Sequence, residues 1–359
     1  MYKCACCTYV FHCKNATFAL YSKSFFSHVT DVAALCNIMK IIVTGGAGFI
    51  GSNIVETLLG REDVHQVTVF DNLSTGFEKN LTPFFTHPKF NFIQGDITNL
   101  EVCMEVCQGA DAVCHQAALG SVPRSIQNPM ATHQANVDGF VNMLDAARLS
   151  GIKRFVYASS SSIYGDAAYS PKVEENTGNP LSPYAVTKSA NELYANVFHR
   201  TYGMEVIGLR YFNVFGSRQD PHGAYAAVVP LFFKAALNNQ SPTIFGDGTI
   251  TRDFTFIDNV VAINILALTT TNEEAFGKAY NVACGATTNL TQIWEAIKKI
   301  TGCNAEAIYG APRKGDILQS LADISSAQKH LNYNPLIGVE EGLKRSLEWY
   351  KEQKNKSEN

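Results

Sequence analysis

Residues 40–51 read KIIVTGGAGFIG and decide the fold of the chain. The first half is a short apolar run rich in β-branched residues, which predicts a buried strand. Gly45, Gly48 and Gly51 follow with the spacing G-x-x-G-x-x-G, and a segment of helical period begins among them. Here the first glycine permits a tight turn, the second lets the backbone approach a pyrophosphate, and the third lets helix and strand pack closely. The stretch predicts a dinucleotide-binding turn with the phosphates at the helix N-terminus.

Apolar strands alternate with amphipathic helices from Met39 to about residue 216. The expected strands are KIIVTG, QVTVFD, FNFIQGDI, DAVCHQAA, RFVYASS and EVIGLRYFNVFG. This alternation predicts an α/β fold, a Rossmann doubly wound parallel sheet with helices on both faces. Beyond residue 216, helical segments near 228–238, 291–301 and 340–353 mix with Gly/Pro-rich loops, which predicts a smaller α/β C-terminal substrate lobe.

The composition is that of a soluble globular protein, with 46% hydrophobic and 17% charged residues and a formal net charge of −3. No strong basic excess indicates nucleic acid, and no run of about eighteen apolar residues indicates a membrane span. Cys103 and Cys107 share one face of an expected helix without a histidine or a second cysteine pair nearby, so we expect core packing and no metal. The scattered thiols indicate a reducing cytoplasm.

Two acidic residues end the strands that follow the glycine turn. Asp71 lies twenty residues after Gly51, at the end of QVTVFD. A carboxylate there accepts hydrogen bonds from the adenosine ribose hydroxyls and repels a 2′-phosphate, which favours NAD over NADP. Asp96, in the GDI that ends the third strand, is expected to contact the adenine.

The stretch SPYAVTKSA places Tyr184 and Lys188 at positions i and i+4 of an expected helix, hence on one face. A tyrosine with its ordinary pKa of about 10 needs help to act as a base near neutral pH. A lysine ammonium and the positive nicotinamide of NAD⁺ both favour the tyrosinate. Because the pair follows a dinucleotide turn, we interpret it as catalytic and not as a chance pattern on a surface helix.

Between residues 39 and 350 the chain contains the motifs TGGAGFIG, DNLS, GDI, HQAA, SSSSIYG, SPYAVTK, RYFNVFG, GDGTITRDF and PRKGD. On these motifs it resembles the extended short-chain dehydrogenase/reductase superfamily, specifically its NAD-dependent nucleotide-sugar epimerases, and is most similar to the bacterial UDP-N-acetylglucosamine 4-epimerases. The resemblance implies NAD as cofactor. It also implies a cofactor site made of Gly45, Gly48, Phe49, Ile50, Gly51, Asp71, Asn72, Ser74, Gly76, Asp96, Ile97, Gln116, Ala117, Ala118, Asn136, Ser159, Tyr184, Lys188 and Tyr211.

The alternation and the resemblance together predict the domain organisation. Residues 39–215 are expected to form the NAD-binding Rossmann domain, to which a later segment at about 254–283 returns. Residues 216–253 and 284–359 are expected to form the nucleotide-sugar-binding lobe. Residues 1–38 hold half of the ten cysteines and show no clear period, and we expect a disordered or non-native extension there.

The serine run in YASSSSIYG, residues 157–165, separates the reactions of this superfamily. By resemblance, the catalytic serine lies four residues before Tyr164, which is Ser160. The 4,6-dehydratases follow it with Asp and Glu, and the decarboxylating xylose synthases keep a Glu at the position of Ser162. Ser161 and Ser162 stand here instead, and elimination or decarboxylation then lacks a carboxylate acid or base that it needs. The run therefore favours plain epimerisation.

The resemblance also implies a mechanism. Tyr184, as tyrosinate, takes the proton from the sugar O4 while a hydride moves from C4 to NAD⁺. Lys188 holds the nicotinamide ribose and lowers the pKa of Tyr184, and Ser160 with Ser161 hydrogen-bonds O4. The 4-keto sugar then turns within the pocket and the hydride returns to its other face, so tightly bound NAD is regenerated in each cycle.

A UDP-sugar site is implied at Gly120, Ser121, Ser160, Ser161, Tyr184, Asn213, Ala227, Val228, Arg252, Arg313, Asp316 and Ser320. Arg252 and Arg313 match a pyrophosphate clamp, and Asp316 matches a carboxylate that holds the uridine ribose. Ser320 stands where galactose-only epimerases carry a bulky tyrosine, and a serine leaves room for an acetamido group at C2. We therefore expect reversible C4 epimerisation of UDP-N-acetylglucosamine to UDP-N-acetylgalactosamine, as in bacterial polysaccharide biosynthesis.

Other functions stay open on the sequence. A UDP-N-acetylglucosaminuronate 4-epimerase is compatible with it, since Arg124 or His222 could meet a C6 carboxylate, and UDP-glucose 4-epimerase activity could persist in a widened pocket. A non-catalytic NAD-sensing regulator and a net reductase belong to other classes. The retained tyrosine–lysine pair disfavours the first, and Asp71 disfavours the second.

The expected partners follow from the same resemblance and from the composition. The superfamily commonly dimerises through a four-helix contact, which implies a homodimer through the helices around 131–149 and 184–202. Neither nucleic acid nor a membrane is expected as a partner. The expected location is the cytoplasm.

Overall fold

The computed structural model describes residues 39–223, 226–312 and 319–358. The predicted extension at 1–38 and the predicted substrate residues Arg313 and Asp316 lie outside these described residues. In the described part of the chain, none of the helices combines the length and the apolar composition that a membrane crossing needs.

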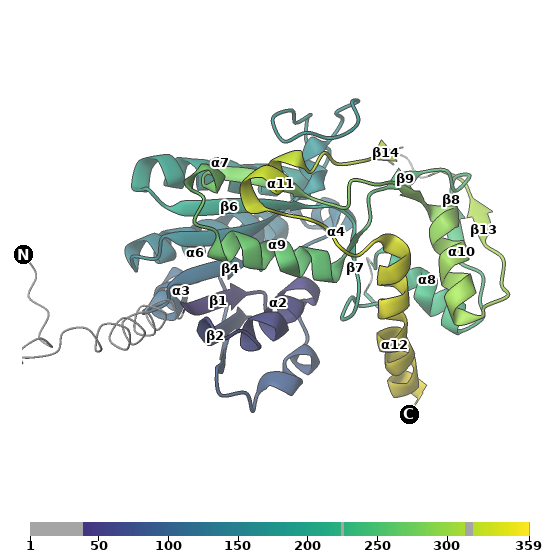
Figure 1. Cartoon of the computed structure of the whole chain (residues 1–359), viewed down its shortest axis with the longest axis horizontal. Helices are drawn as coiled ribbons and strands as arrows, with labels where there is room; N and C mark the ends of the chain where they lie inside the picture. The colour runs from purple at the N-terminus through teal and green to yellow at the C-terminus, as the bar shows by residue number, and fades with distance from the viewer. Residues whose placement is uncertain (1–38, 224–225, 313–318, 359) are drawn as a thin grey trace, which may run out of the picture. The chain divides into compact units, whose positions relative to one another are not determined.

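A parallel sheet, seven-stranded within the described residues, forms the centre of the fold (Figure 1). Its strands lie in the order β11-β6-β5-β4-β1-β2-β3, and each neighbouring pair is parallel. The order reverses between β1 and β4, the point at which open α/β sheets bind ligands beyond their carboxyl ends. The strands are β1 (Met39–Thr44), β2 (Val64–Asp71), β3 (Phe90–Gln94), β4 (Ala112–His115), β5 (Arg154–Ser160), β6 (Glu205–Tyr211) and β11 (Lys278–Val282). This is the predicted Rossmann arrangement.

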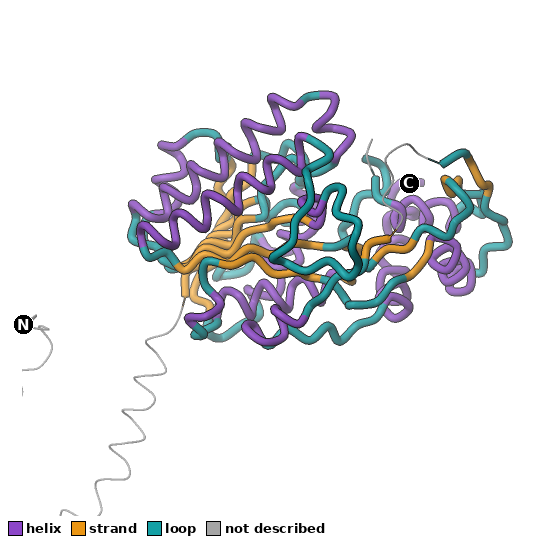
Figure 2. The backbone as a smooth tube through the Cα atoms, turned by 90° about the horizontal axis from the view of Figure 1, so that it is seen from above, coloured by secondary structure: helices purple, strands orange, loops and turns teal. Residues whose placement is uncertain are grey.

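Helices cover both faces of the sheet, as the view from above shows (Figure 2). One layer contains α2 (Phe49–Leu59) and α9 (Ile257–Thr269), which pack on each other. The opposite layer contains α3 (Leu100–Cys107), α6 (Gly139–Leu149) and α7 (Pro183–Tyr202). Between β4 and α6 the chain forms short helical turns, namely α4 (Val122–Gln127), α5 (Pro129–His133) and the π-helical turn η4 (Gln134–Asp138).

Successive side chains of β1 show why both layers are needed. Ile41 and Val43 are buried in the core on the α2 side, and Ile42 is buried in the core on the α3 side, because neighbouring side chains of a strand point to opposite faces. Cys103 and Cys107 of α3 are buried in this second core. Burial raises the pKa of each thiol to about 12, so both stay protonated and pack as small apolar groups.

A smaller lobe follows β6 along the chain. Its helices α8 (Val228–Leu237), α10 (Leu290–Thr301) and α12 (Val339–Glu358) pack together. Phe233 stacks on Tyr350 with 4.4 Å between ring centroids. Short strands pair beside the helices: β8 (Thr243–Phe245) with β13 (Ile308–Gly310), and β9 (Thr251–Arg252) with both β12 (Thr288–Asn289) and β14 (Gln319–Ser320).

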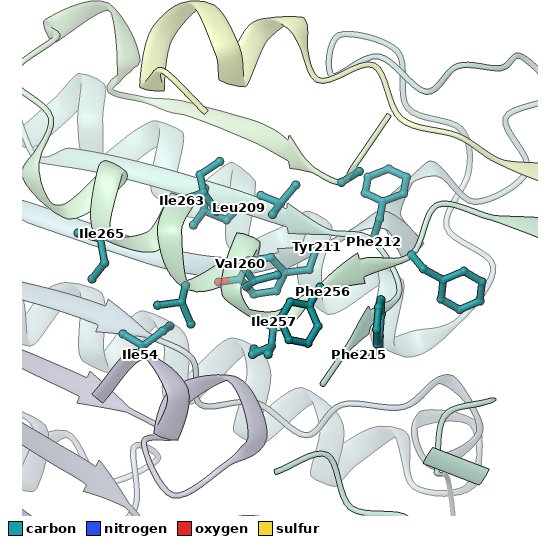
Figure 3. Close-up of a cluster of buried hydrophobic side chains, with 14 of the residues drawn as sticks. Ile54, Leu209, Tyr211, Phe212, Phe215, Phe256, Ile257, Val260, Ile263 and Ile265 are labelled. Carbon is teal, nitrogen blue, oxygen red and sulfur yellow. The ribbon is translucent and has the colours of Figure 1, made fainter. Parts of the chain in front are cut away.

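The sheet and the lobe share one hydrophobic core (Figure 3). Tyr211 at the end of β6 hydrogen-bonds Asn264 of α9, and Phe215 packs on Phe256 with 5.6 Å between ring centroids. These two phenylalanines belong to β7 (Val214–Phe215) and β10 (Thr255–Phe256), which pair with each other. After β10 the chain returns to the sheet as α9 and β11. The exact domain division stays a prediction.

The remaining described elements are short and connect the larger ones. Helix α11 packs against α9 and β11. The bounds of these elements are η2 (Glu78–Asn80), η3 (Thr82–Phe84), η5 (Ser161–Tyr164), η6 (Glu273–Ala275) and α11 (Ser325–Leu331). Of these, η5 matters for the site because it begins directly after the last residue of β5.

Candidate functional site

A cavity of about 550 Å³ opens at the carboxyl ends of the central strands, and we call it the cofactor cavity. Every residue predicted to hold the cofactor lines it, with the exception of Asn136. The lining includes Gly45, Gly48, Phe49, Ile50, Gly51, Asp71, Asn72, Ser74, Gly76, Asp96, Ile97, Gln116, Ala117, Ala118, Ser159, Tyr184, Lys188 and Tyr211. The structure thus brings the predicted residues together, and the contact that each makes with the cofactor stays a prediction.

The glycine turn leaves no room for side chains. Gly45 has a φ of +67°, and a Cβ there would lie 2.6 Å from the backbone nitrogen of Ala117. A Cβ on Gly51 would lie 2.2 Å from the carbonyl oxygen of Gly45, which is too close for helix α2 to keep its place on β1. No side chain caps α2 at Gly48, so the first-turn N–H groups of the helix face the cavity. This cradle fits a pyrophosphate.

Asp71 at the end of β2 also holds the glycine loop in place. Its Oδ2 accepts a hydrogen bond of 2.9 Å from the N–H of Ala47, and its Oδ1 accepts one of 2.8 Å from Leu73. Burial raises the pKa of Asp71, while the two backbone hydrogen bonds act in the opposite direction. Each carboxylate oxygen has a further lone pair, so the residue can still accept a ribose hydroxyl.

Asp96 lies on the rim of the same cavity, next to a neighbour that orients it. Its Oδ2 accepts a hydrogen bond of 2.7 Å from Asn72, and its Oδ1 accepts one of 2.7 Å from the hydroxyl of Thr98. Partial burial raises the pKa of Asp96, and these hydrogen bonds outweigh it, so the pKa lies below its ordinary value. A charged carboxylate at this rim suits hydrogen-bond donors of the cofactor.

Asn136 lies behind the cavity wall, almost fully buried in the π-helical turn η4. Its Oδ1 accepts a hydrogen bond of 2.7 Å from the N–H of Leu119, and its Nδ2 donates to the carbonyl of Leu119 and to Thr187 Oγ1, both at 3.2 Å. It therefore ties the loop after β4 to helix α7. The neighbouring loop residue Gly120 lines the cavity, and Ser121 adopts a φ of +98° while capping α4.

The predicted catalytic residues meet where β5 ends beside the start of α7. Ser160 lies near enough to Tyr184 for its hydroxyl to lower the pKa of the phenol, and Lys188 Nζ donates a hydrogen bond of 2.8 Å to the carbonyl of Ala158. The same Nζ lies 6.0 Å from the centroid of the Tyr184 ring. Ser161 begins the next turn, η5. A phenol, a hydroxyl and an ammonium are thus held together at the wall of the cofactor cavity.

Burial dominates the titration of this group. It lowers the pKa of Lys188 to about 8, against the opposing effect of the Glu192 carboxylate. It raises the pKa of Tyr184, and the nearby Ser160 hydroxyl only partly offsets that rise. The protein's own groups therefore leave the pKa of Tyr184 above its ordinary value, where the sequence predicted a lowering by Lys188.

The turn that follows Ser160 contains hydroxyls and no carboxylate. Ser160 Oγ accepts a hydrogen bond of 3.1 Å from the N–H of Ser162, which orients the hydroxyl toward the start of η5. Ser162 Oγ is buried and has no hydrogen-bond partner among the described residues. The turn can therefore hold a sugar hydroxyl, but its own side chains offer no acid for elimination.

A second cavity, of about 430 Å³, lies in the lobe, and we call it the lobe cavity. Of the predicted substrate residues, Asn213, Val228 and Arg252 line it, and Ala227 caps α8 directly before Val228. Most of its wall is apolar, formed by residues that include Leu231, Phe232, Ile244, Phe245, Ile250, Phe254 and Leu290. Tyr211 lines the cofactor cavity and Asn213 the lobe cavity, so the end of β6 adjoins both.

Ser320 pairs with Arg252 in the parallel strands β14 and β9. The arrangement depends on Asp253, a fully buried residue that the sequence reasoning missed. Its N–H donates a hydrogen bond of 2.7 Å to the carbonyl of Ser320, and its carboxylate accepts from the N–H groups of Cys284 at 2.9 Å and Gly285 at 3.0 Å. Burial raises the pKa of Asp253 to about 6, with the backbone hydrogen bonds acting against it. Asp253 positions the strand that carries Arg252.

Sequence reasoning also missed part of the cofactor-cavity wall. Thr98 follows GDI directly, so its position after Asp96 was a usable signal. The other missed residues lie outside the recognised motifs or contribute mainly backbone. They are Phe70, Thr75, Gly95, Leu119, Ala131, Gln134, Ala135 and Ala158. Among the described residues, no group of three or more His, Cys, Asp and Glu side chains is placed to hold a metal ion.

A hydroxyl, a phenol and an ammonium beside a dinucleotide cavity are the groups with which short-chain dehydrogenases/reductases move a proton and a hydride, so fold and site define a member of that class. More narrowly, the chain belongs to the NAD dependent epimerase/dehydratase family, whose model matches residues 41–283. The expected family, the NAD cofactor and the epimerase class are thereby confirmed.

Individual relatives agree with this placement along nearly their whole length. The chain is 36% identical to a UDP-glucose 4-epimerase from Mycolicibacterium smegmatis, over 89% of this chain and 100% of that protein. It is 37% identical to the structure of a UDP-N-acetylglucosamine 4-epimerase from Methanobrevibacter ruminantium M1 in complex with UDP-N-acetylmuramic acid, with a TM-score of 0.83 over 88% of this chain and 99% of that chain. A UDP-glucuronic acid 4-epimerase from Bacillus cereus, in complex with UDP-glucuronic acid and NAD, is 31% identical with a TM-score of 0.81 over 88% and 100%.

Proposed function

We propose that this NAD-dependent epimerase acts on UDP-sugars and that its substrate pair is UDP-N-acetylglucosamine and UDP-N-acetylgalactosamine. The observation that carries the proposal is the small residue Ser320, whose strand β14 pairs it with Arg252, a residue of the lobe-cavity wall. A hydroxymethyl group leaves space for an acetamido substituent that an aromatic ring would fill. The relative from Methanobrevibacter ruminantium, named for UDP-N-acetylglucosamine, supports the same substrate.

The chemistry of the reacting carbon falls to the group at the start of α7. When bound, NAD supplies the acceptor and donor of the C4 hydride and a positive charge that favours the tyrosinate. Tyr184 Oη takes the proton from the sugar O4 and later returns it. Ser160 Oγ, beside Tyr184, holds O4 in line with that transfer. Lys188 Nζ, fixed by the carbonyl of Ala158, presents its ammonium to the cofactor ribose.

The serine run supports epimerisation over elimination. Ser161 and Ser162 occupy the turn η5, where the resemblance places the carboxylates of dehydratases. Their hydroxyls cannot act as the acid that expels water or as a base of comparable strength. Once the O4 proton and the C4 hydride have left, no side chain of this turn offers the 4-keto sugar a route other than reduction at C4.

The diphosphate is assigned to the lobe cavity. Arg252 lines that cavity, and its guanidinium suits a diphosphate oxygen pair. Asn213 is held by a hydrogen bond of 3.0 Å to the carbonyl of Asp253, which directs it into the same wall. Arg313, as the second arginine of the clamp, and Asp316, as the carboxylate for the uridine ribose, stay predictions, since both lie outside the described residues.

A substrate assay tests the proposal. The purified chain is incubated separately with UDP-N-acetylglucosamine, UDP-glucose and UDP-N-acetylglucosaminuronate, and the C4 epimers are resolved by chromatography. We expect UDP-N-acetylglucosamine to be converted with the highest kcat/KM and the protein to carry NAD without added cofactor. A failure to convert UDP-N-acetylglucosamine would overturn the substrate assignment, and a protein that carries no NAD and converts none of the three would favour the regulator or the reductase.

The structure gives less support to a uronate substrate, because His222 lies away from both cavities. His222 lines a separate cavity of about 200 Å³ together with Lys79, Arg218 and Trp349, away from the lining of both the cofactor cavity and the lobe cavity. Arg124 lies on the short helix α4, three residues after the predicted substrate residue Ser121, which caps that helix. The incubation with UDP-N-acetylglucosaminuronate therefore tests the alternative in which Arg124 meets a C6 carboxylate. Conversion of this substrate alone would replace the proposed substrate.

The homodimer is proposed to form through α6 and α7. Val186, Leu193 and Val197 are large apolar residues of α7, exposed by 54%, 70% and 48%, and their spacing places them on one helix face. A second copy would bury this stripe. Light scattering is expected to give a dimer mass, and Leu193→Glu is expected to shift it to the monomer; a monomeric parent protein would contradict the assignment. The cytoplasmic location likewise stays a proposal.

A further inference from the structure

Helix α7 carries a carboxylate, Glu192, one turn beyond its tyrosine and lysine. Tyr184, Lys188 and Glu192 follow one another at intervals of four residues, so they share the helix face that packs against β5 and β6. Glu192 Oε1 accepts hydrogen bonds from Ser159 Oγ at 2.5 Å and from Arg210 Nε at 2.9 Å. Its Oε2 accepts from Arg210 Nη2 at 2.8 Å, which makes the ion pair bidentate.

Arg210 extends this contact to the serine turn. Its Nη1 donates hydrogen bonds of 2.9 Å to Tyr164 Oη and to the carbonyl of Glu174. Tyr164 ends η5 and donates in turn to Asn281 Oδ1 at 2.7 Å. One carboxylate therefore connects α7 with the end of β5 and, through Arg210, with the turn that begins at Ser161.

We propose that Glu192 is a positioning residue, which holds the serine-bearing end of β5 and η5 against α7 and supplies the negative charge that faces the Lys188 ammonium. The inference rests on the proposed function for its kinetic readouts. Ser159 is the neighbour of Ser160, and the Ser160 hydroxyl lies near enough to Tyr184 to lower the pKa of its phenol. A shift of Glu192 would therefore move the hydroxyl and the phenol relative to each other.

The burial of this ion pair argues against a purely stabilising role. The side chains of Arg210 and Glu192 are only 7% and 16% exposed. Desolvation of two charges often costs as much as their attraction returns, so a buried pair is weak support for stability. Glu192 contacts Ser159, the residue before Ser160, and lies one helical turn after Lys188. This placement instead suits the alignment of the site.

The other groups around Lys188 leave Glu192 as the charge that acts on it. From β4, His115 has a pKa of about 3 because of burial and the nearby Lys188, so it is neutral. Burial raises the pKa values of Tyr157, Tyr184 and Tyr211, so these three phenols are neutral before NAD⁺ binds, and Arg210 is paired with Glu192 itself. Burial lowers the pKa of Lys188 to about 8 and the Glu192 carboxylate opposes it. Loss of the carboxylate would thus remove the proton from Lys188 at a lower pH.

Glu192→Gln tests the proposal against Glu175→Gln. The glutamine keeps the shape of residue 192 and an acceptor for Ser159, but removes the charge. Glu175 lines the same surface cavity as Glu192, separate from the cofactor and lobe cavities, and is the matched control position. For Glu192→Gln we expect kcat to fall about tenfold and the alkaline limb of the kcat–pH profile to move down by about one unit. Glu175→Gln is expected to leave both unchanged.

A second readout does not depend on turnover. Carbon-13 NMR of ε-labelled lysine follows the Lys188 ammonium directly in the NAD-bound protein, with its signal identified by loss in Lys188→Met. We expect its midpoint to fall in Glu192→Gln by the same unit as the kinetic limb. A folded Glu192→Gln protein with both midpoints unchanged would overturn the inference. A wild type that epimerises no UDP-sugar would instead refute the proposed function, and the NMR midpoint would still decide the role of Glu192.

Ser159→Ala keeps the inference testable if Glu192→Gln fails to fold. The variant removes the hydrogen bond between β5 and Glu192 and leaves the ion pair with Arg210 in place; because Ser159 also lines the cofactor cavity, NAD content is measured beside kcat. We expect a several-fold loss of kcat with the alkaline limb unmoved, because the charge is retained. A kcat equal to that of the wild type would contradict the positioning role.

Discussion

The cofactor cavity and the lobe cavity are built from different kinds of chain segment. Backbone, glycines and small side chains at the ends of adjacent parallel strands make up much of the cofactor cavity. The lobe cavity instead collects side chains from the end of β6, from α8, β8, β9 and from the start of α10. The first is thus a property of local turns at one sheet edge, and the second depends on how distant segments pack. Substitutions should therefore affect the two cavities in different ways.

The largest effect is expected from Tyr184→Phe, which tests the proposed base in the wall of the cofactor cavity. Removal of the phenolic oxygen takes away the proton acceptor for O4 and leaves the ring in place. We expect kcat to fall about a thousandfold while NAD stays bound, as measured by epimer formation and by cofactor content. Tyr194→Phe on an exposed face of the same helix is the control. Turnover near that of the wild type would refute the assignment of the base.

Gly51→Ala tests the cofactor cavity. The added Cβ would lie 2.2 Å from the carbonyl oxygen of Gly45, so α2 must shift away from the glycine turn. We expect loss of co-purified NAD and a fall in the free energy of unfolding of about 1–3 kcal/mol. Gly338→Ala, where a Cβ meets no atom within 4 Å, is the control. Full NAD content in Gly51→Ala would show that the turn tolerates a side chain.

Arg252→Met tests the lobe cavity, and the expected signature is in KM. The methionine keeps part of the aliphatic packing and removes the cation that faces the diphosphate. We expect KM for the UDP-sugar to rise about tenfold to a hundredfold with kcat changed less, since a charged hydrogen bond contributes about 1.5–3 kcal/mol. NAD content is expected to stay constant, with the exposed Arg345→Met as control. A large fall in kcat at unchanged KM would place Arg252 with the reacting groups instead.

The smallest effect is expected from Ser320→Tyr, which sharpens the substrate assignment. The ring would add bulk at the position that strand pairing places beside Arg252. We expect the ratio of kcat/KM for UDP-N-acetylglucosamine over UDP-glucose to fall by roughly tenfold or more, with UDP-glucose turnover retained. Ser320→Ala keeps the space and should keep the ratio. An unchanged ratio in Ser320→Tyr would separate this position from the C2 substituent.

The cofactor cavity could be predicted because the sequence motifs that form it lie close together in the chain. A glycine turn between strand and helix fixes the site of the phosphates, and Asp71 ends the very next strand. The same reasoning missed α9 and β11 as individual elements. Helix α9 is buried along most of its length between sheet and lobe, so it lacks the polar face that marks an amphipathic helix in sequence.

The roles of some polar residues also needed the structure. Asn136 was expected at the cofactor and lies behind the wall, holding Leu119. Asp253 was not singled out, yet its buried carboxylate joins the loops after β11 to the strand that carries Arg252. A sequence shows which residue types are present, but the partners of a buried polar group come from segments that only packing brings near.

The sequence by itself determined the Rossmann sheet, the NAD turn, the family and the Tyr184–Lys188 pair. These depend on backbone geometry and side-chain periodicity within a few residues, which neighbours along the chain set. Only the tertiary structure placed Ser320 beside Arg252 and joined Glu192 to Ser159 and Arg210. Such contacts form between strands and helices that meet through burial of the shared core, and no local pattern encodes their distance.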